Sequence, residues 1–248
     1  MTKQNGLGDN FYLGGYNISG DTSAFDEITA TTELQENTGI DKSAYERLGG
    51  LRDGKIAWTA WFNDAAERAH VALSPLPTAD TQAMYFRGTT LGGSGAAAVV
   101  KQVNYGGKRS DKGELSFEVE ALGSSYGIEW GALGTAGIRT DTTATNGSAI
   151  DNGAATSYGL QAYLQVFAVT GTSVTVKLQE SSDSGGSDAW ADVTGGAFGA
   201  KTGRAVQRIA TANNLPVERY LRVVTSGTFS NAQFAVLIVR NEVEGVVF

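Results

Sequence analysis

The residues from Lys55 to Phe62 constrain the fold most, because they alternate as a β-strand and carry a tryptophan on each face. One face holds Ile56, Trp58, Ala60 and Phe62, and the other holds Ala57, Thr59 and Trp61. A strand with one face in water needs no tryptophan on that face. We therefore expect this strand to be covered on both sides, by the core of its own domain on one and by a helix or another subunit on the other.

A helix is expected directly after this strand. Asn63 is a favourable N-cap, and Asp64 and Glu67 fall in the first turn, where the helix dipole stabilises negative charge. The pattern predicts a helix over residues 63–73, which Pro75 helps to end. Since strand, cap and helix follow one another without a linker, the helix must fold back beside the sheet.

Composition favours many short strands joined by glycine turns, because the 248 residues include 33 glycines and only 3 prolines. The chain contains no cysteine, so packing and strand pairing must hold the fold without disulfides or thiolate metal sites. The sequence shows no apolar run long enough to span a bilayer, and the N-terminus lacks the apolar core of a signal peptide. These features predict a soluble protein that is made in the cytoplasm and does not contact a membrane.

The sequence divides into two expected β domains. Residues 1–134 carry an N-terminal arm, several strands and the one expected helix. Residues 135–156 are small and polar, which is typical of a linker. Residues 157–248 contain strand-like segments without helical spacing, which predicts an all-β sandwich. The expected fold class is mainly β, with one flanking α-helix in the first domain.

Two further segments of the first domain bear on function. The polar stretch 37–54 is expected to be a surface loop, or alternatively an arm that reaches a neighbouring molecule. Residues 99–105 and 115–121 are expected to pair as a hairpin across a polar glycine turn.

Charge argues against a nucleic-acid-binding protein. The chain holds 19 Lys and Arg against 26 Asp and Glu, which gives a net charge of -7. Residues 1–138 hold 11 basic and 17 acidic residues, a net of -6, and residues 139–248 hold 8 and 9, a net of -1. A nucleic-acid binder needs a basic footprint to release counterions. The densest basic spot, Lys108–Arg109, is followed by Asp111 and is expected to be a solvated loop.

Enzyme chemistry finds little support in the sequence. His70 is the only histidine, and no nucleophile-elbow motif lies near it. Two carboxylates can serve a glycosidase, but Glu118 and Glu120 alternate on one strand, which is typical of its wet face. A few aspartates near Trp190 offer oxygen ligands for calcium, yet their spacing matches no EF-hand. We expect no catalytic residue, no metal site and no cofactor.

The stretch from Thr38 to Asn63 resembles the tail tube proteins of long-tailed bacteriophages. In that family a Thr-Gly strand end leads to a charged arm and then to a Gly-Leu-x-Asp-Gly turn, which here is 50–54. An alternating strand follows and ends in an aromatic residue and an Asn or Asp, here Phe62 and Asn63. The later hairpin of residues 99–121 is similar to the family's closing hairpin. The resemblance covers roughly residues 10–130.

The resemblance implies a tail-tube-like β-sandwich or barrel that assembles into hexameric rings, which stack into the conduit for DNA ejection. It implies a virion protein that meets other tail proteins, including a tape measure protein, and lets DNA pass without sequence-specific binding. The C-terminal part is similar to Ig-like or lectin-like decorations on such proteins, with Trp190 and Gly195–Gly196 in its signature. The alternative function is a head or tail decoration or adhesion protein whose C-terminal sandwich binds host glycans.

Candidate site residues follow from these interpretations. The expected subunit-interface residues are Tyr45, Arg47, Leu51, Trp58 and Trp61. The expected lumen-lining residues are Glu114, Glu118 and Glu120, unless these are ordinary solvated charges on an outer face. Trp190 either stacks on a sugar or plugs the end of the C-terminal sandwich.

Overall fold

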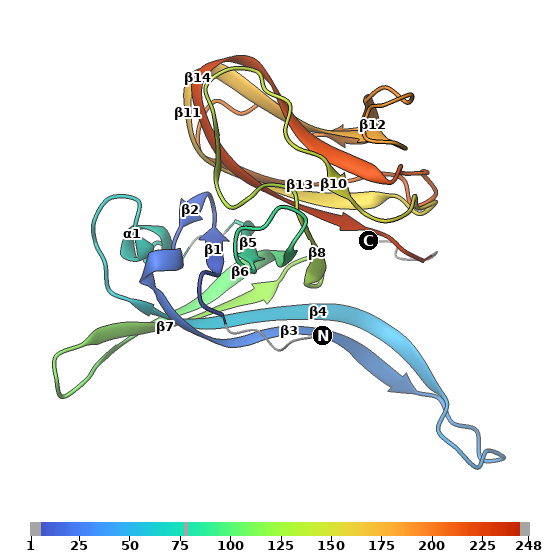
Figure 1. Ribbon diagram of the computed structural model, residues 1–248. Coiled ribbons are helices and arrows are strands. Elements are labelled where there is room, and N and C mark those ends of the chain that lie inside the picture. Colours follow the sequence, from blue (N-terminus) through green and yellow to red (C-terminus); the bar gives the residue numbers. More distant parts are fainter. Residues whose placement is uncertain (1–5, 77–78, 244–248) are drawn as a thin grey trace.

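The computed structural model describes residues 6–76 and 79–243, and their regular structure is almost entirely β (Figure 1). The first half contains β1 (Asn10–Leu13), β2 (Tyr16–Asn17), the 3-10 helix η1 (Ser19–Asp21), β3 (Thr22–Glu36), β4 (Arg47–Trp61), α1 (Ala69–Leu73), β5 (Thr81–Phe86), β6 (Ser94–Arg109) and β7 (Leu115–Gly123). The second half contains β8 (Glu129–Leu133), β9 (Arg139–Asp141), β10 (Ile150–Asp151), β11 (Leu160–Ser181), β12 (Ala191–Ala197), β13 (Ala205–Ala210) and β14 (Tyr220–Arg240). The expected mainly β class is confirmed.

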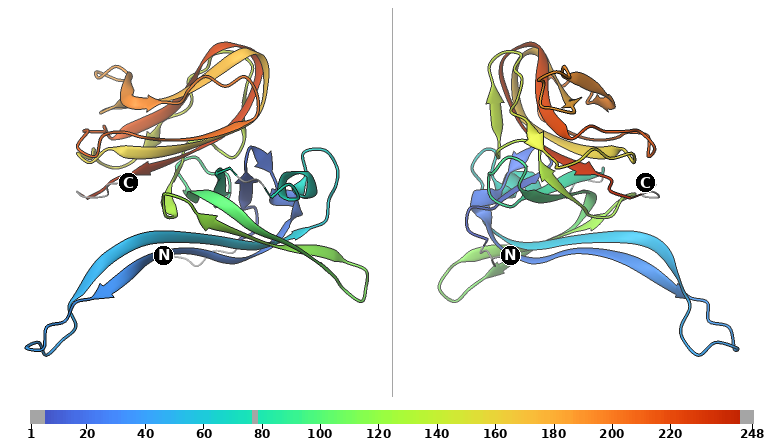
Figure 2. Two further views of the ribbon diagram at one scale, coloured as in Figure 1. Left: turned by 180° about the vertical axis from the view of Figure 1, so that it is seen from behind. Right: turned by 45° about the vertical axis from the view of Figure 1, so that its right-hand side comes forward.

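Within the described residues, all 14 strands belong to one continuous hydrogen-bonded sheet that forms two lobes. We call residues 6–123 the N-terminal lobe and residues 134–243 the C-terminal lobe. β8 lies between them and pairs with β6 on one side and with β14 on the other. Figures 1 and 2 show the C-terminal lobe seated on β5, β6 and β8, while the β3–β4 ribbon projects away on the far side.

The C-terminal lobe is built on two long strands that pair antiparallel along their whole lengths, β11 and β14. Both strands bend sharply and so contribute to both layers of the lobe (Figure 1). The bend falls at register shifts between Val166 and Ser173, where Gly171 and Gly227 have φ angles of 131° and 118°. Those conformations favour glycine. The four strands expected at 160–168, 174–179, 220–225 and 234–240 are therefore halves of two bent strands.

The segment expected to be a linker, residues 135–156, is part of the C-terminal lobe. It contributes β9 and β10, and both pair with β14. Its small side chains let the backbone lie close against that strand. Arg139 anchors it by donating two hydrogen bonds of 2.8 Å to Asp141, which in turn accepts one of 2.7 Å from Thr225. The linker prediction was wrong because a polar segment can be ordered by backbone pairing without large apolar side chains.

Three apolar clusters hold the structure together. One fills the N-terminal lobe around Trp58, and a second fills the C-terminal lobe between the layers of β11 and β14. The third joins the lobes, and its fully buried members include Tyr12, Phe86, Tyr163 and Leu237. The lobes therefore share a continuous buried contact.

The helix after β4 is shorter than the sequence predicts. α1 spans only Ala69–Leu73, and its N-cap position is Arg68. Asn63 instead accepts a hydrogen bond of 3.2 Å from the backbone N–H of Ala65 and so caps an isolated turn. Glu67 follows with a φ angle of 67°, which no helix accommodates. The expected helix is thus broken, although its last turn does pack beside the sheet through the buried Leu73.

Strand β4 was expected to be covered on both faces, but this chain covers only one of them. Ile56, Trp58 and Ala60 are buried in the N-terminal lobe, where the Trp58 ring meets Phe11 edge to face at 4.9 Å. On the other face, Trp61 is 43% exposed. The strand also begins earlier than expected, at Arg47, so that the stretch 37–54 is a strand-and-loop arm and not a simple surface loop.

We expect the two tryptophans of β4 to respond differently to truncation. Trp58→Ala should lower the free energy of unfolding by about 3–5 kcal/mol, because it leaves a cavity in a core. Trp61→Ala should change it by less than about 1 kcal/mol, because the residue is 43% exposed and belongs to none of the three apolar clusters. Denaturant unfolding of both variants measures this, and equal losses would contradict the assignment of faces.

The division into separately folding units remains a prediction. Because β9 and β10 pair with β14, the second unit is expected to begin at residue 135 instead of residue 157. We expect residues 135–248 to melt cooperatively on their own, and residues 157–248 to melt at a lower temperature. The shorter fragment loses β9 and β10, and each lost backbone hydrogen bond costs about 0.5–1.5 kcal/mol. Circular dichroism melting of both fragments tests this, and an unfolded longer fragment would count against two units.

Candidate assembly surface

The part of the sheet that carries the candidate residues is a four-stranded layer in the order β3-β4-β7-β6. The pairing of β4 with β7 aligns Trp58 with Val119 and Ile56 with Ala121, and these four side chains face the core. Alternation then places Thr59 opposite Glu118 on the solvent side. The layer thus has one face in the N-terminal lobe and one face in water.

Both lateral edges of this layer are open. Among the described strands, β3 pairs with β4 alone, so its outer edge is unpaired from Thr22 to Glu36. On the other side, β6 pairs with β5 only as far as Val100, and no described strand continues along that edge toward Arg109. Unpaired edges are templates for pairing with another chain. Two such edges on opposite sides of one layer allow each copy to join a different neighbour at each edge.

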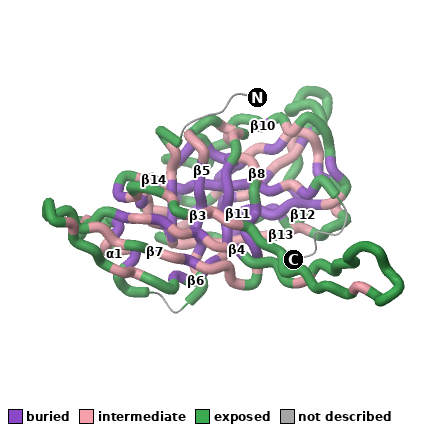
Figure 3. The backbone as a smooth tube through the Cα atoms, turned by 90° about the horizontal axis from the view of Figure 1, so that it is seen from below, coloured by how far each residue is buried: buried purple, intermediate pink, exposed green. Residues whose placement is uncertain are grey.

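The β3–β4 ribbon extends beyond the layer as an arm, which we define as residues 31–52. Its two strands pair with each other, and its loop is closed by a hydrogen bond of 2.9 Å between Asn37 N–H and the Glu46 carbonyl. Figure 3 shows the arm standing clear of the body with its surface exposed. A two-stranded ribbon is marginally stable by itself in water. The arm therefore has the character of an element completed by a neighbour.

The arm exposes an unusual amount of apolar surface. Its exposed large hydrophobic side chains are Leu34, Ile40, Tyr45, Leu48 and Leu51, and Leu51 is 79% exposed. Arg47 lies over the Tyr45 ring at 4.9 Å. Three of the five expected interface residues, Tyr45, Arg47 and Leu51, thus lie together on the arm. Exposed apolar groups that gather on one element mark an interaction surface.

The other two expected interface residues lie apart. Trp58 is fully buried in this chain, so it is not available to a neighbour, and that assignment is wrong. Trp61 lies at the opposite end of the layer from the arm, on the solvent face that it shares with Thr59. On the opposite face of the layer, the Phe62 ring lies 5.9 Å from that of Phe117, which stacks on Tyr105 at 4.2 Å. Phe62, Tyr105 and Phe117 form a second, partly exposed aromatic group, to which Trp61 does not belong.

His70 belongs to the same aromatic group. Its Nδ1 lies 2.9 Å from the Tyr105 hydroxyl, and its ring centre lies 4.8 Å from that of Phe62. The partners of this histidine are thus aromatic rings and a phenol, which suits a packing role at the edge of the layer.

The solvent face of the layer carries an ordered row of charges. Lys55 on β4 lies 3.2 Å from Glu27 on β3 and 3.3 Å from Glu120 on β7. Hydrogen bonds to Glu27 and then to Glu120 raise the pKa of Lys55. Hydrogen bonds from Thr29 and then Lys55 lower the pKa of Glu27. Lys55 and Glu27 were missed from sequence, although alternation with Ala57 and Thr59 places Lys55 on this face.

The three expected lumen residues divide between this face and the hairpin tip. Glu118 and Glu120 lie on the solvent face of β7 and lie opposite Thr59 and Ala57 of β4. Glu114 lies in the turn before β7, where its N–H donates to the Ser110 hydroxyl at 3.2 Å. The structure therefore brings two of the three onto one surface and leaves Glu114 apart.

A buried polar cluster fixes one lobe to the other. Arg208 on β13 donates to Glu129 on β8 at 2.8 and 3.0 Å and to the Tyr163 hydroxyl at 3.1 Å. The Tyr163 hydroxyl also donates to Glu129, and the Tyr126 ring covers the guanidinium at 3.8 Å. Burial, and then the charge of Glu129, raise the pKa of Tyr163. Removal of one partner would leave a buried charge unpaired, so the cluster resists separation of the lobes.

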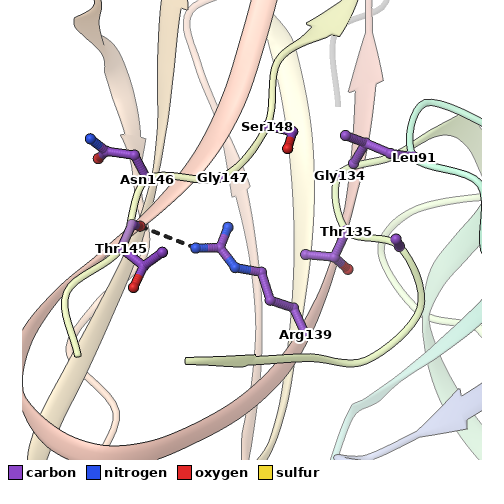
Figure 4. A pocket seen from close by; sticks show the side chains of 9 residues that line it. Leu91, Gly134, Thr135, Arg139, Thr145, Asn146, Gly147 and Ser148 are labelled. Atoms are coloured by element: carbon purple, nitrogen blue, oxygen red, sulfur yellow. Dashed lines mark hydrogen bonds between the residues drawn. The ribbon is translucent and has the colours of Figure 1, made fainter. Parts of the chain in front are cut away.

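A pocket of about 330 Å³ lies where residues 134–148 cross the C-terminal lobe (Figure 4). Arg139 is the charged residue in its lining, and its guanidinium donates to Asp141, to the Val223 carbonyl and to the Thr145 carbonyl. Since these bonds already engage the guanidinium, the pocket shows no charged group directed at a ligand.

The described residues contain no group of three or more His, Asp or Glu side chains placed to hold a metal ion. Asp183 uses its carboxylate to accept backbone N–H groups of its own loop. Across the described ranges, the structure has no helix with the length and apolar character needed to cross a bilayer.

Comparisons with known proteins gave only distant likenesses. No protein-family model matches the sequence, and no curated protein matches it. A chain from the tail of an empty gene transfer agent particle with C6 symmetry is 18% identical, with a TM-score of 0.42, and covers 52% of this chain and 100% of that chain. The Dit (gp 19.1) protein of SPP1 is 9% identical, with a TM-score of 0.34. The match covers 94% of this chain and 99% of the Dit chain. A chain of the phage p2 baseplate is 8% identical, with a TM-score of 0.31. The match covers 94% of this chain and 99% of the baseplate chain. Likenesses this distant decide neither the fold nor the function of this chain.

Proposed function

We propose that the chain is a structural subunit of a phage tail, located in the virion, that forms the tail tube by assembling with copies of itself. The observation that carries this proposal is the four-stranded layer with two open edges, β3 on one side and the distal half of β6 on the other. The resemblance of residues 38–63 to tail tube proteins supports the same role. The protein acts through assembly and not through catalysis.

The open edges define the kind of assembly. When β3 of one copy pairs with β6 of the next, the contact uses different surfaces on the two partners. Such a head-to-tail contact forms a ring if the rotation between copies closes. The resemblance supports a ring of six copies. Main-chain pairing between copies would remove every open edge of the layer, as closed barrels do.

The arm then provides contacts between rings. It projects beyond the layer and carries exposed apolar residues that this chain leaves uncovered, with Leu51 and Tyr45 among them. Burial of apolar surface contributes about 25 cal/mol per Å², so a neighbour that covers these side chains would stabilise the stack. Contacts with other tail proteins, including a tape measure protein, belong to the same proposal.

The solvent face of the layer would line the conduit through which DNA leaves the particle. Duplex DNA carries one negative charge per roughly 1.7 Å, so unpaired cations on this face would hold it back. Lys55 lies between two carboxylates, and Glu118 stands beside them on β7. A lining of this kind would let DNA pass without binding it.

A second candidate function is a decoration or adhesion protein whose C-terminal lobe binds a host glycan. The observation that favours it is the position of Trp190. It is partly exposed and belongs to none of the three apolar clusters, so it does not plug the sandwich. A tube subunit forms rings or filaments by itself, whereas a decoration protein stays small and binds sugar.

The assembly proposal predicts that polar substitutions on the arm abolish polymers and spare the fold. Tyr45→Ser, Leu48→Ser and Leu51→Ser together should change the free energy of unfolding by less than about 1 kcal/mol, because all three side chains are exposed. Light scattering and negative-stain microscopy should show rings and tubes for the native chain and small species for the variant. Val243→Ser, at an exposed position outside the arm, is the control. Native protein that remains monomeric at high concentration would contradict the proposal.

If Glu118 and Glu120 line the conduit, replacing them with cations should slow the passage of DNA. Tubes with Glu118→Lys and Glu120→Lys should retain DNA and eject it more slowly at low salt, and added salt should restore the rate. Glu218→Lys and Glu242→Lys change the charge of the C-terminal lobe by the same amount and should have no such effect. If the variant tubes hold no DNA and eject it at the native rate, these residues do not line the conduit.

A further inference from the structure

The outer face of the C-terminal lobe presents a fixed tryptophan. Trp190 follows the loop of residues 182–189 between β11 and β12, and Figures 1 and 2 show β12 on the side of the lobe away from the β3–β4 ribbon. Asp183 closes this loop by accepting the backbone N–H groups of Gly186 at 2.8 Å and Ser187 at 2.6 Å. Those bonds lower the pKa of Asp183, with that from Ser187 contributing most.

The loop backbone sets the position of the indole. Gly185 has a φ angle of 82°, and a Cβ atom there would lie 2.3 Å from Trp190 Nε1. The glycine therefore allows the loop to lie directly against the edge of the ring. The guanidinium of Arg222 lies 4.4 Å from the centre of the ring. Trp190 is held from two directions and is still partly exposed.

A row of polar side chains crosses the sheet beside this tryptophan. Asp192 on β12, Gln179 on β11 and Arg222 on β14 occupy directly opposed positions on three adjacent strands. Gln179 donates to Asp192 at 2.8 Å and accepts from Arg222 at 2.7 and 3.0 Å. Lys177, two residues along β11, donates to the other oxygen of Asp192 at 2.6 Å.

We propose that this surface, formed by Trp190 with Lys177, Gln179, Asp192 and Arg222, binds a pyranose unit of a neutral glycan. The C–H face of a pyranose is apolar and can stack on an indole, while its hydroxyl groups both donate and accept hydrogen bonds. Asp192 supplies acceptor oxygens, and the side chains around it supply donors. Neighbouring hydroxyls of one sugar ring need that combination.

The row is ordered before any ligand arrives. Its members already hold one another by hydrogen bonds, so a ligand need not immobilise them, and this lowers the cost of binding. Hydrogen bonds from Lys177 and then Gln179 lower the pKa of Asp192, which keeps it an ionised acceptor. Each carboxylate oxygen retains a further lone pair for a sugar hydroxyl.

Charge argues for a neutral glycan over a polyanion. The row contains two cations and one carboxylate, and Lys177 already pairs with that carboxylate. A polyanion site would gather several unpaired cations. The inference rests on the second proposed function, glycan binding by the C-terminal lobe, and not on ring assembly, because all five side chains belong to one lobe of one chain.

The test uses the full chain labelled with 5-fluorotryptophan, which gives one fluorine resonance for each of its four tryptophans. Single Trp→Phe variants assign the resonances. Dextran, amylose, mannan, galactan and chitin hexasaccharide are then titrated separately. We expect at least one glycan to shift the Trp190 resonance and to leave those of Trp58 and Trp61 unchanged.

Substitutions separate a binding site from a structural network. Asp192→Asn should weaken the shift-detected affinity about tenfold, as loss of a charged hydrogen-bond acceptor does. Trp130→Phe, at another exposed tryptophan, is the matched control and should leave affinity unchanged. The unperturbed resonances of the other tryptophans report whether the variant is folded.

Three results would overturn the proposal. The first is that none of the five glycans shifts the Trp190 resonance. The second is that a glycan shifts only another tryptophan. The third is that Asp192→Asn, with its other resonances unchanged, binds the glycan as well as the native chain does.

Discussion

Strand β6 is the element on which the rest of the structure depends, because its two ends take part in different layers. Its first residues pair with β5 and β8, and its distal part pairs with β7. Where these layers meet, Ala96 and Ala98 face the core of the N-terminal lobe and Ala97 faces the contact between the lobes, and all three are fully buried. Side chains this small let two cores approach from opposite faces of one strand. Larger residues would force the lobes apart and misalign β8 with β14.

The same strand explains why the lobes are joined and not merely tethered. β8 adds to β6 and also pairs with β14, so main-chain hydrogen bonds run from one lobe into the other. The buried cluster of Glu129, Tyr163 and Arg208 lies across the same contact. Apolar burial, strand pairing and a desolvated ion pair thus act at one junction, and each constrains the position of the others.

Local alternation made the main features of the N-terminal lobe predictable from sequence. The pattern around Trp58 gave the right strand and core face, and the hairpin of β6 with β7 was expected from two apolar runs and a glycine turn. The pattern could not separate Trp58 from Trp61, because burial depends on what the remote strands β1 and β7 bring to each face. The prediction of a helix over residues 63–73 was wrong for a local reason that helix propensity does not capture. Asn63 caps an isolated turn, and Glu67 has a left-handed backbone conformation.

Contacts between distant strands were the least predictable part of the candidate site. The row from Glu27 through Lys55 to Glu120 depends on the register of three strands, and a shift of one residue would move Lys55 to the other face. The segment 135–156 looked like a linker because its residues are small, yet that property is what lets it pair along β14. The sequence singled out Trp190, but only its partial exposure in the folded chain shows that it lies at the surface.

The unsupported arm has a consequence for the time course of assembly. Two free copies that meet must order their arms while gaining a single edge contact, so the first complexes would dissociate readily. A copy that joins an existing ring would gain several contacts at once for the same loss of freedom. Growth would therefore show a lag, a critical concentration and acceleration by preformed seeds, and the site where a tube begins would be decided by whichever component first holds an arm in place.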